Sequence, residues 1–114
     1  MKRTMLAAVC SFGLVVGLSG CTNEEIARDA ITQYFPKSEV EKAMDVAKCE
    51  SGYDPKAVSP DGANHGLFQI NTVHKPLVRR MGYQWNPDIY DPYVNTHVAR
   101  RLWKESGWQP WSCA

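Results

Sequence analysis

The stretch that decides the fold reads CESGY at residues 49–53 and AVSPDGANHGLFQIN at residues 57–71. Its first part places Glu50 at the end of an amphipathic helix, directly before a Ser-Gly pair. Its second part is a polar, glycine-rich turn that leads into an apolar segment carrying a glutamine and an asparagine. A carboxyl group on the apolar face of a helix is a candidate general acid. The two parts together predict an acid beside a polar cleft suited to sugars.

The helix that carries Glu50 is predicted to begin at Ser38. The Ser38 side chain can accept a backbone hydrogen bond while Glu41 reaches back, which is the capping-box arrangement. One apolar face follows at helical spacing, formed by Val40, Ala43, Met44 and Ala47. Glu50 continues this face, and Gly52 ends the helix. We therefore expect the Glu50 carboxyl group to lean toward the interior, where partial burial raises its pKa by favouring the neutral form.

The other segments predict a mainly α domain of the α+β class. Residues 22–35 read as a short helix or a tether, and residues 54–71 as a loop or short hairpin. Leu67, Phe68 and Ile70 are expected to re-enter the core. A short helix is predicted at 76–81, an irregular segment at 83–90, and a last helix with Asp91 as its cap and Pro92 at its first position.

The first twenty residues have the features of an export signal. Lys2 and Arg3 precede a mostly apolar run at 5–18, which is too short to span a bilayer comfortably. The run ends in Leu-Ser-Gly-Cys, which resembles a bacterial lipoprotein processing site with Cys21 as the lipidated residue. We expect a signal peptide at 1–20, a lipidated N-terminus with a tether or short helix at 21–37, and the folded domain at 38–114. An ordinary signal peptide and an uncleaved anchor remain as alternatives.

The remaining cysteines predict one disulfide. Cys10 would leave with the signal peptide and Cys21 would take the lipid, so Cys49 and Cys113 remain in an oxidising compartment. A bond between them would close a loop across nearly the whole domain and contribute up to roughly 4 kcal/mol. No metal or other cofactor is expected, because the cysteines lie far apart and no ligand spacing joins the three histidines, His65, His74 and His97.

Charge and length exclude some classes of partner. The formal net charge of +1 falls to −1 when Lys2 and Arg3 leave with the signal peptide. No basic stripe or basic-aromatic alternation indicates nucleic acid. The chain of 114 residues is expected to form one small, monomeric domain.

The pattern ESGYDPKAVSPDGA…GLFQI resembles the transglycosylase SLT domain, within the lysozyme-like superfamily. The resemblance spans roughly residues 40–102 and includes YDPYVNTHVARRL, which is similar to the family's DP-x-x-N helix. Cys49 beside Glu50, with a second cysteine after a Pro-Trp pair, is similar to the muralytic domains of resuscitation-promoting factors. The segment NHGLFQIN is similar to animal lysozymes. The resemblance implies a lysozyme-like domain at 38–114 with a loop or hairpin cleft and one disulfide.

The resemblance also implies an activity and a set of site residues. The activity is cleavage of the β-1,4 bond between N-acetylmuramic acid and N-acetylglucosamine in peptidoglycan. Glu50 matches the family's catalytic acid, Ser59 a serine that contacts the saccharide, and Gln69 a glutamine that lines the cleft. Tyr90 matches a cleft tyrosine.

Many glycosidases use a second carboxylate, and this chain has no clear one. Animal lysozymes have an aspartate where this chain has Asn64, and Asp61 lies in a turn where aspartate is common. A single acid favours the lytic transglycosylase route, in which Glu50 acts first as acid and then as base and leaves 1,6-anhydromuramoyl ends. Asn64 would then position the acetamido group or a water. Asn71 either bonds sugar groups or caps the next segment.

Several alternatives remain open from the sequence. The enzyme could instead be a hydrolytic muramidase, or the chain a non-catalytic peptidoglycan-binding or phage-exclusion lipoprotein. The intact Glu50 argues against the non-catalytic classes. Expected partners are glycan strands of peptidoglycan and a membrane reached through the N-terminal lipid, which implies an exported, anchored protein. Three tryptophans either stack on sugars or pack in the domain: Trp85, Trp108 and Trp111.

Overall fold

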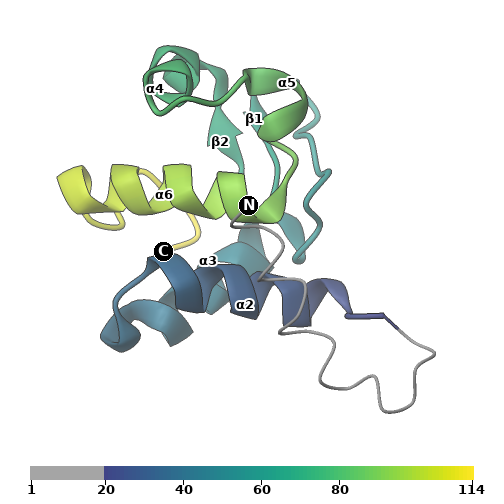
Figure 1. Cartoon of the computed structure of the whole chain (residues 1–114), viewed down its shortest axis with the longest axis vertical. Helices are drawn as coiled ribbons and strands as arrows, with labels where there is room; N and C mark the ends of the chain where they lie inside the picture. The colour runs from purple at the N-terminus through teal and green to yellow at the C-terminus, as the bar shows by residue number, and fades with distance from the viewer. Residues whose placement is uncertain (1–19) are drawn as a thin grey trace.

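A computed structural model of the chain describes residues 20–114, so the predicted signal peptide lies outside the described residues apart from Gly20. Three longer helices form the body: α2 (Asn23–Tyr34), α3 (Val40–Ser51) and α6 (Pro92–Ser106). The smaller elements are η2 (Lys37–Glu39), β1 (Asn64–His65), β2 (Ile70–Asn71), η3 (Thr72–His74), α4 (Lys75–Arg80) and α5 (Trp85–Asp88). Figure 1 shows α6 between the α2–α3 pair and the end of the molecule that holds the hairpin, α4 and α5. The predicted class, mainly α with a small β component, is confirmed.

The hydrophobic core lies where α2, α3 and α6 meet the hairpin. Phe68 is fully buried, and each of the three helices buries one face against it or its neighbours. The predicted apolar face of α3 is confirmed, because its buried residues are Val40, Ala43, Met44, Val46 and Ala47. The predicted cap of α6 is also confirmed, since the Asp91 carboxylate accepts hydrogen bonds from the backbone N–H groups of Tyr93 and Val94 at 2.8 and 3.2 Å.

The predicted capping box at Ser38 and Glu41 is wrong. The turn η2 runs directly into α3, so Ser38 lies inside a helical turn, and no side chain caps the first turn of α3. Glu41 instead accepts two hydrogen bonds from Arg28 of α2, at 2.7 and 3.2 Å. The ion pair joins α2 to α3 across the surface, and it occupies the carboxylate that the capping box would need.

A capping box does exist at the start of α2. The Thr22 hydroxyl accepts a hydrogen bond from the Glu25 backbone at 3.1 Å, and the Glu25 carboxylate accepts one from the Thr22 backbone at 2.9 Å. Of the two alternatives for residues 22–35, a helix or a tether, the structure therefore has the helix. Ala27 and Ile31 of this helix are fully buried, so α2 is packed into the domain.

One buried carboxamide seats the hairpin on α6. The strands pair antiparallel, with Asn64 opposite Asn71. The Asn95 side chain of α6 accepts a hydrogen bond from the Phe68 backbone at 2.8 Å and donates to the carbonyls of His65 and Ile89 at 3.0 and 2.9 Å. Gly66 has a φ of +82°, and a Cβ there would lie 2.2 Å from Asn95 Nδ2, so only glycine fits.

The predicted disulfide between Cys49 and Cys113 is confirmed. After α6 the chain turns at Gly107 and returns toward α3, where the bond fixes it (Figure 1). Among residues 20–114, no helix is both long and apolar enough to cross a bilayer.

Candidate active site

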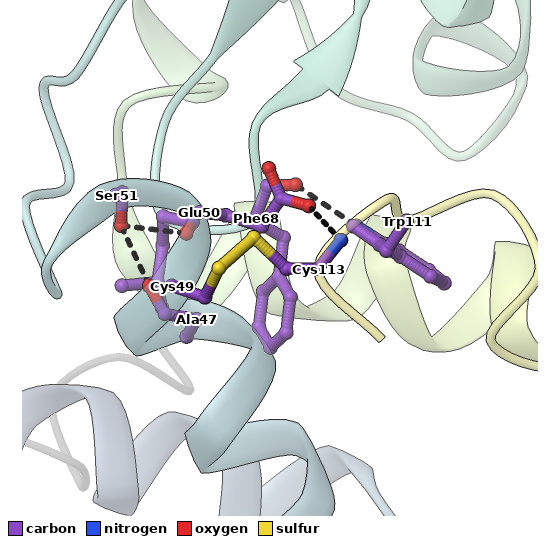
Figure 2. Close-up of a disulfide and its surroundings, with 8 residues drawn as sticks. Ala47, Cys49, Glu50, Ser51, Phe68, Trp111 and Cys113 are labelled. Atoms are coloured by element: carbon purple, nitrogen blue, oxygen red, sulfur yellow. Dashed lines mark hydrogen bonds between the residues drawn. A yellow bond between two sulfur atoms is a disulfide. The ribbon is translucent and has the colours of Figure 1, made fainter.

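The last turn of α3 presents Glu50 at the edge of the core. Its side chain is half-buried, and burial raises the pKa of the Glu50 carboxyl group above its ordinary value, as expected from the sequence. The backbone N–H of Cys113 donates to Glu50 Oε2 at 3.3 Å, which opposes part of that increase. Figure 2 shows the carboxylate directed toward this N–H, beside the disulfide. The site therefore holds a carboxyl group whose protonated form is favoured more than that of a carboxyl group in water.

One hydrogen bond tethers the end of α3 to the hairpin loop, and another tethers the C-terminal segment to the same loop. The Ser51 hydroxyl donates to the backbone carbonyl of Leu67 at 2.7 Å, directly beside Glu50 in sequence. On the other side, the buried Trp111 donates its indole N–H to the carbonyl of Phe68 at 2.9 Å (Figure 2). Because Leu67 and Phe68 are consecutive, both tethers converge on one point of the loop. Glu50, in the last turn of α3, is thereby held beside the C-terminal segment.

A polar cavity of about 120 Å³ opens beside this assembly. It is lined by Asn64, Gln69, Ile70, Asn71, His74, Leu102, Pro110 and Trp111. Three of the predicted substrate-binding residues are therefore brought together: Asn64, Gln69 and Asn71. Glu50 does not line the cavity, but the segment that includes Trp111 and Cys113 connects the cavity wall to its carboxylate.

The amides in the cavity are held in fixed orientations. Gln69 has a φ of +52°, a left-handed conformation that is uncommon outside glycine, and its Nε2 donates to the carbonyls of Ala57 and Gly66. Asn71 caps η3 through the Val73 N–H at 2.9 Å and also donates to Asn64 Oδ1 at 3.0 Å. Asn71 is therefore a cap that also orients Asn64. Within residues 20–114, Gln69 Oε1 and Asn64 Nδ2 have no hydrogen-bond partner.

Ser59 and Asp61 belong to the turn that supports β1. The Ser59 hydroxyl donates to Asp61 at 2.6 Å and accepts from the backbone of Asn64 at 3.0 Å. That hydroxyl, together with the Ala63 N–H, holds the pKa of Asp61 below its ordinary value. Asp61 is an exposed, ionised turn residue in this conformation, and neither residue lines the cavity.

Tyr90 is hydrogen-bonded to His65, outside the cavity lining. The Tyr90 hydroxyl lies 2.8 Å from His65 Nδ1, and His65 Nε2 lies 2.9 Å from the carbonyl of Gly62. The buried His65 thus links the turn before β1 to the segment that enters α6. His65 therefore has a structural role in this fold.

The family model for the transglycosylase SLT domain matches residues 30–109. This chain belongs to that family. The match begins inside α2 and ends after Trp108, so it includes Glu50, the hairpin and the whole of α6. The DP-x-x-N helix of the SLT pattern is α6, and its asparagine is Asn95, the residue that seats the hairpin.

Curated relatives of this SLT domain fall into two groups. Lysozyme 1 from Musca domestica is 28% identical over 103 residues, covering 80% of this chain and 73% of the fly protein. Lysozyme 2 from Lucilia sericata is 28% identical, covering 98% of this chain and 87% of its own length. Protein IpgF from Shigella flexneri is 33% identical over 63 residues, covering 53% of this chain and 41% of IpgF. No solved structure matches the chain.

Four residues of this SLT site had no role in the sequence-based prediction, or only a doubtful one. Ser51 was visible in the ESG motif, but its bond to Leu67 depends on a partner 16 residues away. Trp111 was open between stacking and packing, and it does pack, while also forming a wall of the cavity. Half-buried His74 lines the cavity, and burial lowers the pKa of its imidazole. Asn95 gave no local signal beyond its place in the DP-x-x-N motif.

Proposed function

We propose that this SLT domain is a peptidoglycan lytic transglycosylase in which Glu50 is the general acid and base. The observation that carries the proposal is the half-buried Glu50, whose pKa is raised by burial, joined through the C-terminal segment to an amide-lined cavity. A raised pKa keeps a larger fraction of the carboxyl groups protonated near neutral pH, as an acid that protonates a leaving oxygen requires.

The proposed reaction needs one carboxyl group. Glu50 donates its proton to the glycosidic oxygen as the bond from that oxygen to C1 of N-acetylmuramic acid breaks. The substrate's acetamido oxygen stabilises C1 by attacking it. The Glu50 carboxylate then removes the proton from the C6 hydroxyl, whose oxygen attacks C1 and displaces the acetamido oxygen. The proton is back on Glu50, no water is consumed, and the product ends in a 1,6-anhydro ring.

The surroundings of Glu50 favour this single-acid route. Asp61 is occupied by hydrogen bonds from Ser59 and Ala63, and its pKa is lowered, so it serves the turn. Asn64 occupies the place of the lysozyme aspartate and is not a nucleophile. These two observations leave the substrate's own acetamido group as the partner of Glu50.

The cavity has the hydrogen-bonding groups that an acetamido group needs. An acetamido group has one N–H donor and one carbonyl acceptor. Gln69 Oε1 can accept from the first, and Asn64 Nδ2 can donate to the second. The apolar side chains of Ile70, Leu102 and Trp111 line the same cavity and suit the methyl group. We therefore assign Asn64, Gln69 and Asn71 to saccharide binding, with Asn71 acting by orienting Asn64. Ser59 and Tyr90 support them through the turn and through His65.

Digestion of purified peptidoglycan, followed by mass spectrometry of the fragments, tests the proposal. Anhydro ends, lighter than reducing ends by one water, are expected from the parent chain and from Asp61→Asn. Glu50→Gln should still sediment with peptidoglycan but release no fragments. Unchanged release by Glu50→Gln would reject the assignment of Glu50. Binding without cleavage by the parent chain would favour the non-catalytic lipoprotein classes.

A hydrolytic muramidase is the second candidate, because two of the relatives are named lysozymes. Reducing ends in the same digest would support it. Asp61→Asn then separates the routes: a hydrolase that uses Asp61 to position water should lose activity in this variant, whereas a transglycosylase should keep it.

We also propose that the protein is exported and carries a lipid on Cys21. The support is the apolar run at 5–18 followed by Leu-Ser-Gly-Cys. Mass spectrometry of the N-terminal peptide from the host membrane fraction should find a diacylglyceryl group on Cys21. A mature N-terminus at any other residue would contradict the proposal.

A further inference from the structure

A second cavity lies on the opposite side of α6 from the candidate active site. Its volume is about 300 Å³, and it is lined by Tyr34, His97, Arg100, Arg101 and Lys104. Leu102, which lines the amide cavity, is two residues from both Arg100 and Lys104, so these lie about 200° around the helix from it. The second cavity is therefore separate from the cleft, with α6 between them.

The lining of this second cavity is strongly basic. Arg100, Arg101 and Lys104 contribute three positive charges, and no carboxylate lines the cavity. Arg101 is paired with Glu105, whereas Arg100 and Lys104 have no ion-pair partner among residues 20–114. Arg100 and Lys104, which face one cavity without counter-charges, repel each other, and an anion bound between them relieves that repulsion.

Part of the cavity is held rigid before any ligand binds. Arg100 Nε donates to the carbonyl of Tyr34 at 3.1 Å, and its guanidinium lies 5.3 Å from the centre of the Trp103 ring. The Tyr34 and His97 rings stack with centroids 4.6 Å apart, and His97 Nδ1 lies 2.7 Å from the Tyr83 hydroxyl. A fixed guanidinium beside a fixed aromatic pair loses little conformational freedom on binding.

We propose that this basic cavity binds a phosphate group carried by a larger molecule. Planar guanidinium groups bind phosphate oxygens in pairs, and a lysine adds a point charge, so two arginines and one lysine suit a tetrahedral phosphate group. The terminal nitrogens of Arg100 supply donors, because only its Nε is used within the fold. The stacked Tyr34 and His97 rings offer an apolar wall to the part of the ligand next to the phosphate.

Calorimetric titration of the full chain with pyrophosphate at low ionic strength tests the site. The pocket variant is Arg101→Gln/Lys104→Gln, which spares the packed Arg100. The control is Arg79→Gln/Arg80→Gln, which removes the same charge from the exposed face of α4. We expect the affinity of the pocket variant for pyrophosphate to fall by about tenfold or more, because two charge-assisted contacts are lost. The control should bind like the parent.

Two further arms complete the test. Arg101→Lys/Lys104→Arg keeps the charge and should keep the binding, which excludes misfolding of the pocket variant as the cause. Sedimentation of the unlipidated chain with phosphatidylglycerol vesicles, against phosphatidylcholine vesicles, identifies the source. Retention lost only in the pocket variant indicates a lipid headgroup, and equal retention indicates a soluble or wall-borne phosphate. No pyrophosphate binding by the parent, or equal binding by the pocket variant and the control, would overturn the proposal.

Discussion

Replacing both Cys49 and Cys113 by serine removes the covalent bond between the end of α3 and the C-terminal segment. The two residues are 64 positions apart, and a loop of that size corresponds to about 4 kcal/mol of unfolding free energy in the chain-entropy treatment. A domain of this size has a total stability of roughly 5–15 kcal/mol. The bond is therefore expected to supply a large share of the stability of this protein.

Urea unfolding followed by tryptophan fluorescence measures this loss, because Trp108 and Trp111 lie in the segment that the bond fixes. We expect the unfolding free energy to fall by about 3–4 kcal/mol and the thermal midpoint to fall by about 12–30 °C. Ser112→Ala, an exposed change in the same segment that leaves the bond intact, is the control and should unfold like the parent. Matched peptidoglycan digests should also show reduced activity for the double variant, since Glu50 loses its fixed neighbour.

A loss below about 1 kcal/mol would refute the reasoning. It would mean that the noncovalent contacts of the C-terminal segment hold it in place without the bond. Those contacts include the Trp111 indole bond to Phe68 and the Trp108 indole bond to Glu39, at 2.9 and 2.8 Å. A large loss of activity with little loss of stability would instead show that the bond matters for the position of Glu50 alone.

Three further predictions concern single substitutions. Glu50→Gln should be more stable than the parent at neutral pH and equal to it near pH 4. Burial raises the pKa of Glu50 in the folded state above its ordinary 4.5, so the parent loses stability relative to the variant as the pH rises through that folded pKa. Urea unfolding at a series of pH values measures this difference. Gly66→Ala should lower the unfolding free energy by about 2–4 kcal/mol, because its Cβ would lie 2.2 Å from Asn95 Nδ2. Gly62→Ala, whose Cβ would have no atom within 4 Å, should lower it less in the same assay. Thr22→Ala should lower the thermal midpoint through loss of about 1 kcal/mol of capping, and an effect of Ser38→Ala as large as this would contradict the observed caps.

Local patterns were sufficient for the buried face of α3 and for the start of α6, but the segment predicted to be irregular at 83–90 contains the short helix α5. The spacing of apolar residues predicted the buried face of α3, and the Asp-Pro pair predicted the start of α6. Both signals act within one or two turns of chain, so the sequence contains them completely. The disulfide followed from counting cysteines in a chain predicted to be exported, which also needs no knowledge of the packing.

Features that depend on distant partners could not be predicted. Residues 22–25 and 38–41 both have a hydroxyl residue followed three positions later by glutamate, yet only the first pair forms a capping box. The difference is Arg28, which binds Glu41 from another helix. The bonds of Asn95 to Phe68 and His65 likewise span 27 and 30 residues. Such contacts exist only after the helices have packed, so no local sequence pattern predicts them.

With the proposed lipid on Cys21, the capping box at Thr22 would also limit how far the domain reaches from the membrane. Helix α2 begins at Asn23 and is packed into the domain, so only Thr22 separates Cys21 from the rigid body. A lipid on Cys21 would then hold the domain against the bilayer without a flexible linker. The domain measures 42 Å in its longest dimension, so Glu50 would work only on the glycan strands nearest the membrane. Deeper layers of the wall would then stay beyond its reach, so the anchor position would restrict where the wall is cleaved.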